Sequence, residues 1–186
     1  GARVELATRT VFNLLGPISN PSRVKRQLTG VFSKEWVKPI ADTLHNLGCE
    51  KTWVVHGSDG SDEITTTGPT HVACLEDGEV TTFDIVPADA GLPKAKIADL
   101  KGGDSSYNAQ AIKDLLAGKP GAYRDVVLLN AAAALLIAEE VDALESGVTK
   151  AAAAIDSGKA QAVLDKLVEI TNSRNELGEE EEDEER

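Results

Sequence analysis

The spacing of hydrophobic positions changes several times in the first third of the chain, and each change predicts an element. Short β-branched and apolar runs at residues 27–32 and 52–55 predict two strands. Between them, residues 34–47 carry apolar side chains at spacings of one, three and four, which predicts an amphipathic helix that Ser33 caps and Gly48 ends. Pro39 lies inside this range, so the helix either kinks there or starts late enough to hold Pro39 in its first turn. Strand, helix and strand in this order form a βαβ unit, which predicts a parallel pair.

The next segment has the pattern of a β-hairpin. Residues 70–75 and 80–86 roughly alternate between apolar and polar with a period of two, and they flank Asp77-Gly78. Asp-Gly between alternating runs is the strongest short-range signal for a two-residue hairpin turn. We therefore expect a mixed sheet, in which an antiparallel ribbon extends the parallel pair.

Helical patterns dominate the rest of the chain. After a long surface loop at 87–103 with about one helical turn, we expect helices at 105–116, 125–140, 146–156 and 158–171, the second of them buried because it is almost wholly apolar. Residues 3–15 also have near-helical spacing, and the breaker cluster that starts at Gly16-Pro17 predicts a rigid loop at 16–23. The fold class is α/β, with a mixed β-sheet flanked by helices.

Length, charge and cysteine content narrow the function classes. The 186 residues suit one domain with its own core, and the formal net charge of -12 argues against non-specific binding to nucleic acid or to a membrane surface. Eight acidic residues and two arginines fall in 174–186, so we expect a disordered acidic tail after a domain at 1–173. Two cysteines make no disulfide framework, and no apolar run reaches the roughly 20 residues of a membrane span, which together predict a cytoplasmic protein.

The candidate chemistry lies in a glycine-punctuated loop at 56–69, directly after the second predicted strand. Asp62 and Glu63 offer adjacent oxygen ligands, which suit Mg²⁺ because this ion usually takes one or two carboxylates together with substrate phosphates. A solvated turn is the alternative, since Asp, Ser and Gly are also common turn residues. His56 could orient a ligand there. Asn130 is polar within a buried helix, and we expect it to be a hydrogen-bonded packing residue without a functional role.

Several separated motifs, in this order and spacing, resemble the anthranilate phosphoribosyltransferases of tryptophan biosynthesis up to about Asn172. The motifs are residues 3–17, Asn20-Pro21, residues 27–31, Val55-His56-Gly57, Asp62-Glu63-Ile64 and residues 129–135. The resemblance implies transfer of a 5-phosphoribosyl group from phosphoribosyl pyrophosphate to anthranilate by a Mg²⁺-dependent pentosyltransferase. It also implies the C-terminal portion of a nucleoside phosphorylase/phosphoribosyltransferase-like large domain, and a homodimer for the full-length protein.

The same resemblance assigns roles to individual residues. Arg3 matches the position whose guanidinium pairs with the anthranilate carboxylate, Gly16 and Pro17 match a loop that lines the anthranilate entry, and Asp62 with Glu63 matches the magnesium-binding pair. No residue is assigned as a general acid, a base or a nucleophile. Ala7 departs from the family, which commonly has glycine there, but the change is small enough to leave Arg3 in place.

Some parts of the family pattern have no counterpart in this sequence. Neither the upstream glycine-rich loop that cradles phosphates nor the small helical domain is found, and the chain contains no methionine. We therefore expect a C-terminal fragment that is inactive alone. Two alternatives stay open: an enzyme resembling the pyrimidine nucleoside phosphorylases, which share this fold class, and a non-catalytic truncated module for binding or assembly.

Overall fold

The fold is built around one mixed sheet. The computed structural model describes the backbone of residues 12–184 and the side chains of residues 15–173. The sheet has four strands in the order β1-β2-β3-β4. The strands are β1 (Arg26–Gly30), β2 (Lys51–Gly57), β3 (Thr70–Glu76) and β4 (Glu79–Ile85).

The strand pairing confirms the predicted βαβ unit and hairpin. β1 pairs with β2 in parallel, with Leu28 opposite Trp53, and the two later pairings are antiparallel. Asp77 and Gly78 join β3 to β4 with φ angles of 51° and 79°. Two successive positive φ angles define the turn whose twist matches a hairpin, so this short connection sets the register of the ribbon.

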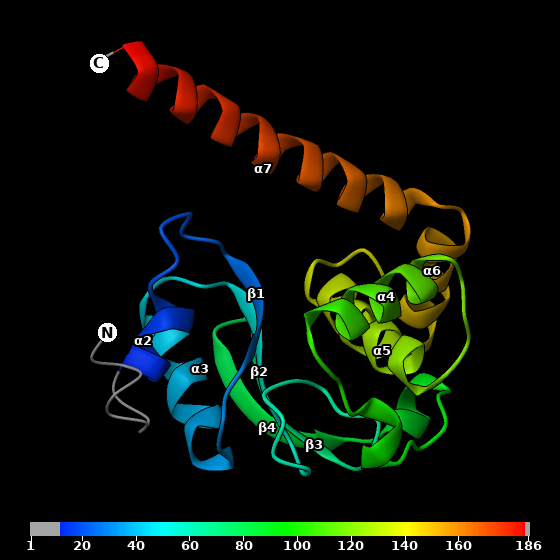
Figure 1. Ribbon diagram of the computed structural model, residues 1–186. Helices are drawn as coiled ribbons and strands as arrows, with labels where there is room; N and C mark the ends of the chain where they lie inside the picture. Colours follow the sequence, from blue (N-terminus) through cyan, green and yellow to red (C-terminus); the bar gives the residue numbers. More distant parts are fainter. Residues whose placement is uncertain (1–11, 185–186) are drawn as a thin grey trace.

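Helices cover both faces of the sheet (Figure 1). On one face, α3 (Val37–Asn46) packs Ile40, Ala41 and Leu44 against Val54 and Ala73 of the sheet. On the other face, α5 (Ala122–Ile137) and α6 (Leu144–Asp156) form a larger core with Trp53, Val55, Val72 and Cys74. The sheet therefore lies between two apolar layers, as an α/β fold requires.

The remaining elements are α2 (Phe12–Ile18), η1 (Lys34–Trp36), η2 (Pro87–Ala90), η3 (Ile97–Leu100), α4 (Ser105–Leu116) and α7 (Lys159–Glu184). Asp104 caps α4, and its side chain accepts a hydrogen bond from the backbone N–H of Tyr107. Among the described residues, no helix combines the length and the hydropathy needed to cross a membrane.

Several helix boundaries differ from those predicted. The loop predicted at 16–23 begins later, because α2 continues through Gly16 and Pro17 to Ile18; a proline one residue before a helix end removes only one backbone bond. The helix predicted at 34–47 begins with a 3₁₀ turn, and Pro39 is the third residue of α3, which is one of the two expected solutions. The buried helix lies at 122–137 rather than 125–140.

The acidic segment at 174–186, for which composition predicts disorder, is mostly helical in the structure. Helix α7 starts beside α6 and runs on through Glu184, across most of the acidic segment (Figure 1). The predicted division into a domain at 1–173 and a tail at 174–186 stays a prediction.

Candidate functional site

The predicted acidic loop leaves the sheet at the C-terminal end of β2 and returns at the start of β3. Its neck is closed by two backbone hydrogen bonds, Ser58 N–H to the Pro69 carbonyl and Gly57 N–H to the Ser61 carbonyl, each 2.9 Å. The loop thus lies at the carboxyl ends of the parallel strands β1 and β2, where open α/β sheets bind ligands.

Close contact between backbones fixes the position of Asp62 over β1. A Cβ atom built on Gly30, the last residue of β1, would lie 1.5 Å from the Asp62 carbonyl oxygen and 2.5 Å from its carbonyl carbon. Any side chain at this position would overlap the loop backbone. Gly30 therefore allows the loop to pass directly over the end of the neighbouring strand.

A side chain from a distant helix holds the other side of the loop. The Asn130 Oδ1 atom accepts a hydrogen bond from Ile64 N–H at 3.0 Å, and its Nδ2 atom donates to the Ile64 carbonyl at 2.8 Å. The expectation that Asn130 is hydrogen-bonded is confirmed, but its partner is the residue that follows Glu63. A polar residue in an apolar helix was the only sequence signal for this contact.

Asp59 organises the inside of the loop. It accepts hydrogen bonds from the hydroxyl groups of Ser61 (2.6 Å), Thr65 (2.6 Å) and Thr67 (2.7 Å), and from the Ser61 N–H (3.1 Å). Partial burial by itself raises the pKa of Asp59, but these donors together outweigh burial and leave the pKa well below its ordinary value. Asp59 is therefore an ionised structural acceptor rather than a metal ligand.

Asp62 and Glu63 are both exposed, on the outside of the loop. Partial desolvation raises the pKa of the Glu63 carboxyl, and the nearby charges of Asp62 and Asp59 raise it further. Three carboxyl groups thus crowd one loop without a compensating cation among the partners of Glu63. Such a cluster favours the binding of a cation.

The donor set fits Mg²⁺ in one particular mode. No group of three or more His, Cys, Asp or Glu side chains within the described part of the chain could hold a metal by itself. Two adjacent carboxylates are suited to an ion that takes its other ligands from water and substrate phosphate. The fit is therefore to a metal bound together with a phosphorylated ligand.

His56 makes a hydrogen bond to the backbone through one ring nitrogen. Its Nδ1 atom lies 2.9 Å from the Val31 carbonyl oxygen and donates to it, which links β2 to the segment after β1. The expectation that His56 could orient a ligand thus gains no support from this contact, and the residue acts as a structural link between the two parallel strands.

Among the described residues, the predicted site residues Gly16 and Pro17 lie away from the acidic loop. Arg3 lies outside the described residues, and Gly16 and Pro17 belong to α2. Pro17 lines a cavity with Gln27 and Cys49, which lie near the N-terminal ends of β1 and β2. The acidic loop is at the opposite ends of these strands, so the structure brings Asp62 and Glu63 together but not Pro17 with them.

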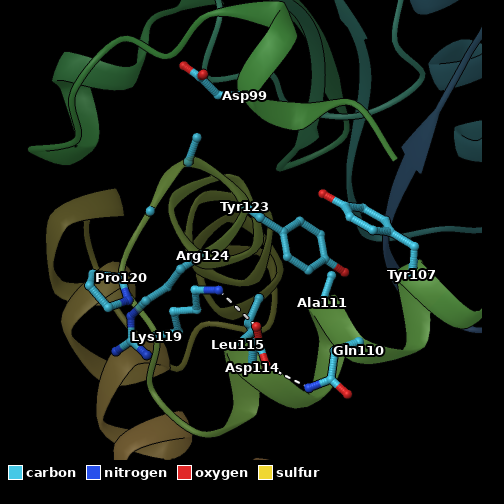
Figure 2. A pocket seen from close by; sticks show the side chains of 12 residues that line it. Asp99, Tyr107, Gln110, Ala111, Asp114, Leu115, Lys119, Pro120, Tyr123 and Arg124 are labelled. Atoms are coloured by element: carbon cyan, nitrogen blue, oxygen red, sulfur yellow. Dashed lines mark hydrogen bonds and ion pairs between the residues drawn. The ribbon is translucent and has the colours of Figure 1, made fainter. Parts of the chain in front are cut away.

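A separate cavity of about 280 Å³ lies between α4 and the start of α5. Figure 2 shows the rings of Tyr107 and Tyr123 beside Ala111, and the ion pair between Lys119 and Asp114 at 2.9 Å. Because Lys119 is already paired, this cavity offers no free ammonium for an anion. It contains none of the predicted site residues, and we assign it no function.

A family model described as "Glycosyl transferase family, a/b domain" matches residues 1–161. The chain belongs to this family. Within the glycosyl transferase family, the anthranilate phosphoribosyltransferase of Rhodopseudomonas palustris is 60% identical over 171 residues, covering 92% of this chain and 50% of the relative. The Agrobacterium fabrum anthranilate phosphoribosyltransferase is 58% identical and covers 94% and 51%. The chain thus spans about half the length of the curated relatives it matches, and the resemblance predicted from the motifs is confirmed.

Solved structures of similar proteins confirm the predicted α/β fold. Anthranilate phosphoribosyltransferase from Thermus thermophilus has a TM-score of 0.79 and 38% identity, covering 88% of this chain and 48% of that chain. The Saccharomyces cerevisiae enzyme in complex with PRPP and Mg has a TM-score of 0.81 and 29% identity, covering 92% and 50%.

Proposed function

We propose that this chain is part of an anthranilate phosphoribosyltransferase. Such an enzyme transfers the 5-phosphoribosyl group of phosphoribosyl pyrophosphate to the amine of anthranilate and releases pyrophosphate. The observation that carries the proposal is the loop with two adjacent exposed carboxylates, held over the carboxyl ends of two parallel strands. The similarity to anthranilate phosphoribosyltransferases, one of them solved with PRPP and Mg, supports it.

Asp62 and Glu63 are the residues that would hold Mg²⁺. When bound, the ion would neutralise charge on the pyrophosphate leaving group, which is electrostatic rather than acid–base catalysis. The chain itself contributes the placement of these carboxylates, because Gly30, Asp59 and Asn130 fix the loop backbone on three sides. A positioned charge is more effective than a mobile one, since no reorganisation is needed during the reaction.

The remaining assignments rest on the resemblance. Arg3 would pair with the anthranilate carboxylate, and Gly16 with Pro17 would line the anthranilate entry. We propose a cytoplasmic homodimer for the whole protein. We also expect no transferase activity from the 186-residue chain alone, because the relatives are about twice as long and nothing in this sequence supplies a backbone cradle for phosphates.

A chimera tests the proposal directly. In it, the matched half of the Rhodopseudomonas palustris relative is replaced by this chain, and turnover is followed by the loss of anthranilate fluorescence with Mg²⁺ and phosphoribosyl pyrophosphate. We expect turnover that the double variant Asp62→Asn, Glu63→Gln abolishes. The matched control is Asp165→Asn with Glu169→Gln, which removes two exposed carboxylates from α7 and should leave turnover unchanged.

The outcome separates the alternatives left open by the sequence. A folded chimera that cleaves a pyrimidine nucleoside with phosphate, and does not consume anthranilate, would favour an enzyme resembling the pyrimidine nucleoside phosphorylases. A folded chimera without either activity would favour a non-catalytic module. Turnover that survives the double variant would show that the loop is not the metal site.

A further inference from the structure

We propose that Asn130 is a positioning residue for the metal-binding carboxylates. It would act by holding the backbone directly after Glu63, so that both carboxylates face the place where a metal and a phosphate meet. This inference rests on the proposed function, because it concerns the same site. It assigns Asn130 a role beyond helix packing.

The contacts of Asn130 are specific to an amide side chain. Its Oδ1 atom accepts from Ile64 N–H, and its Nδ2 atom donates to the Ile64 carbonyl at 2.8 Å and to the Val126 carbonyl at 2.9 Å. Both backbone groups of one loop residue are thus satisfied by one side chain. The carboxamide of Asn or Gln carries a carbonyl acceptor beside an NH₂ donor that can serve two acceptors, and Gln is one methylene longer.

The helix that carries Asn130 is fixed to the rest of the fold. Neighbouring residues of α5, Leu129 and Ala133, are buried in the core under β2 and β3. At the C-terminal end of α5, the Arg26 Nη1 atom of β1 donates to the Ala138 carbonyl at 2.9 Å. A side chain on such an element is held more firmly than one on a loop, so it can transmit a defined position to the loop.

The position of the clamp within the loop gives it a functional consequence. Ile64 is fully buried at 0% exposure, while Asp62 and Glu63 are exposed, so the chain passes from solvent into the core immediately after the carboxylates. Gly30 limits the backbone on the Asp62 side, and Asn130 limits it on the Ile64 side. Without Asn130, the direction of the Glu63 carboxylate would be set on one side only.

The test uses the full 186-residue chain and Mn²⁺ at a fixed concentration of inorganic phosphate, because the two carboxylates suit a metal that takes its other ligands from water and phosphate. The dissociation constant of Mn²⁺ is measured by electron paramagnetic resonance. Asn130→Leu removes both hydrogen bonds at similar volume, and we expect it to weaken Mn²⁺ binding about tenfold, as is common when groups that orient metal ligands are lost. Asn130→Asp keeps the acceptor for Ile64 N–H but loses the donor, and we expect a smaller loss.

A control variant separates positioning from loss of stability. Leu128 lies on α5 in a different core, among residues of α4 and α6, and no residue of the acidic loop belongs to that core. Leu128→Ala should lower the unfolding midpoint and leave Mn²⁺ affinity unchanged below that midpoint. In the chimera, Asn130→Leu should raise KM for phosphoribosyl pyrophosphate and leave KM for anthranilate unchanged.

The outcomes distinguish the two proposals. If Asp62→Asn with Glu63→Gln loses Mn²⁺ binding while Asn130→Leu binds as tightly as the parent chain, Asn130 does not position the carboxylates and the proposed function survives. If the double variant binds Mn²⁺ as the parent does, the loop is not the metal site and both proposals fail. Loss of affinity in Leu128→Ala equal to that in Asn130→Leu would also overturn the positioning role.

Discussion

Replacing Gly30 by alanine tests the contact on which the position of the acidic loop depends. The added Cβ would lie 1.5 Å from the Asp62 carbonyl oxygen and 3.2 Å from its Cα atom. An ordinary contact between such atoms needs more than 3 Å, so the two backbones must separate by roughly 1.5–2 Å. Gly30 and Asp62 meet through their main chains, and Thr29 beside Gly30 is buried. Neither main-chain segment can therefore relieve the contact by a side-chain rotation. We expect a cost of about 3 kcal/mol, at the upper end for overpacking.

Urea denaturation followed by tryptophan fluorescence measures this cost. With a slope of about 2 kcal/mol per molar urea, a loss of about 3 kcal/mol lowers the unfolding midpoint by roughly 1.5 M. Gly16→Ala is the matched control, because a Cβ built on Gly16 meets nothing within 4 Å. Since Gly16 lies in α2, alanine there should stabilise by up to about 1 kcal/mol.

The same variant also reports on the site. If the loop lifts from β1 to admit the methyl group, part of the stability is retained, but Asp62 moves and Mn²⁺ affinity falls. The reasoning is refuted if Gly30→Ala matches the parent chain both in its urea midpoint and in its Mn²⁺ affinity. That result would mean that the loop can shift by more than an ångström without consequence.

Three further variants test the loop and its support. The pKa of Glu63 is raised in the folded chain, so the ionised carboxylate destabilises the fold. Glu63→Gln should therefore have the higher urea midpoint at pH 7. The difference in midpoint between this variant and the parent chain should vanish below pH 4.5, where the carboxyl is protonated in both the folded and the unfolded state. The pKa of Asp59 is lowered, so its contribution to stability is present above the unfolded value of 3.8 and is lost as pH falls. Because Asp59 is exposed and its charge is screened by solvent, Asp59→Asn should cost only about 1 kcal/mol in the same urea assay at pH 7, and progressively less below pH 3.8. Gly147→Ala would place a Cβ 2.8 Å from Ala132 Cα, so thermal unfolding should show a loss of about 1–3 kcal/mol despite the better helix propensity of alanine; an unchanged midpoint would mean that α5 and α6 can separate freely.

Local patterns determined the order and type of most elements. The Asp77-Gly78 turn needs two positive φ angles in a row, which these two residue types tolerate, so the hairpin and its register follow from a few neighbouring residues. The apolar periods of residues 34–47 and of the following strand likewise specify which faces are buried. These features rest on interactions over a few residues, so the sequence contains them directly.

Boundaries depended on more than local propensity. Proline and glycine favour the end of a helix, yet α2 includes both Gly16 and Pro17, and the buried helix starts at Ala122, before the apolar run that predicts it. A helix end is set by a small difference between fraying and packing, which a single residue type does not decide.

For the candidate site, the sequence by itself determined which residues carry the chemistry: two adjacent carboxylates after a buried strand, in an order of motifs that a known family shares. Only the tertiary structure decided how they are held. Gly30 meets Asp62 because β1 and β2 are neighbours, and Asn130 reaches Ile64 across 66 residues because α5 packs on the sheet. Asp59, a third carboxylate of the same loop, turns inward to three hydroxyl groups and so differs from Asp62 and Glu63. Contacts between residues so far apart in the chain form only when the sheet and its helices assemble, and no local pattern specifies them.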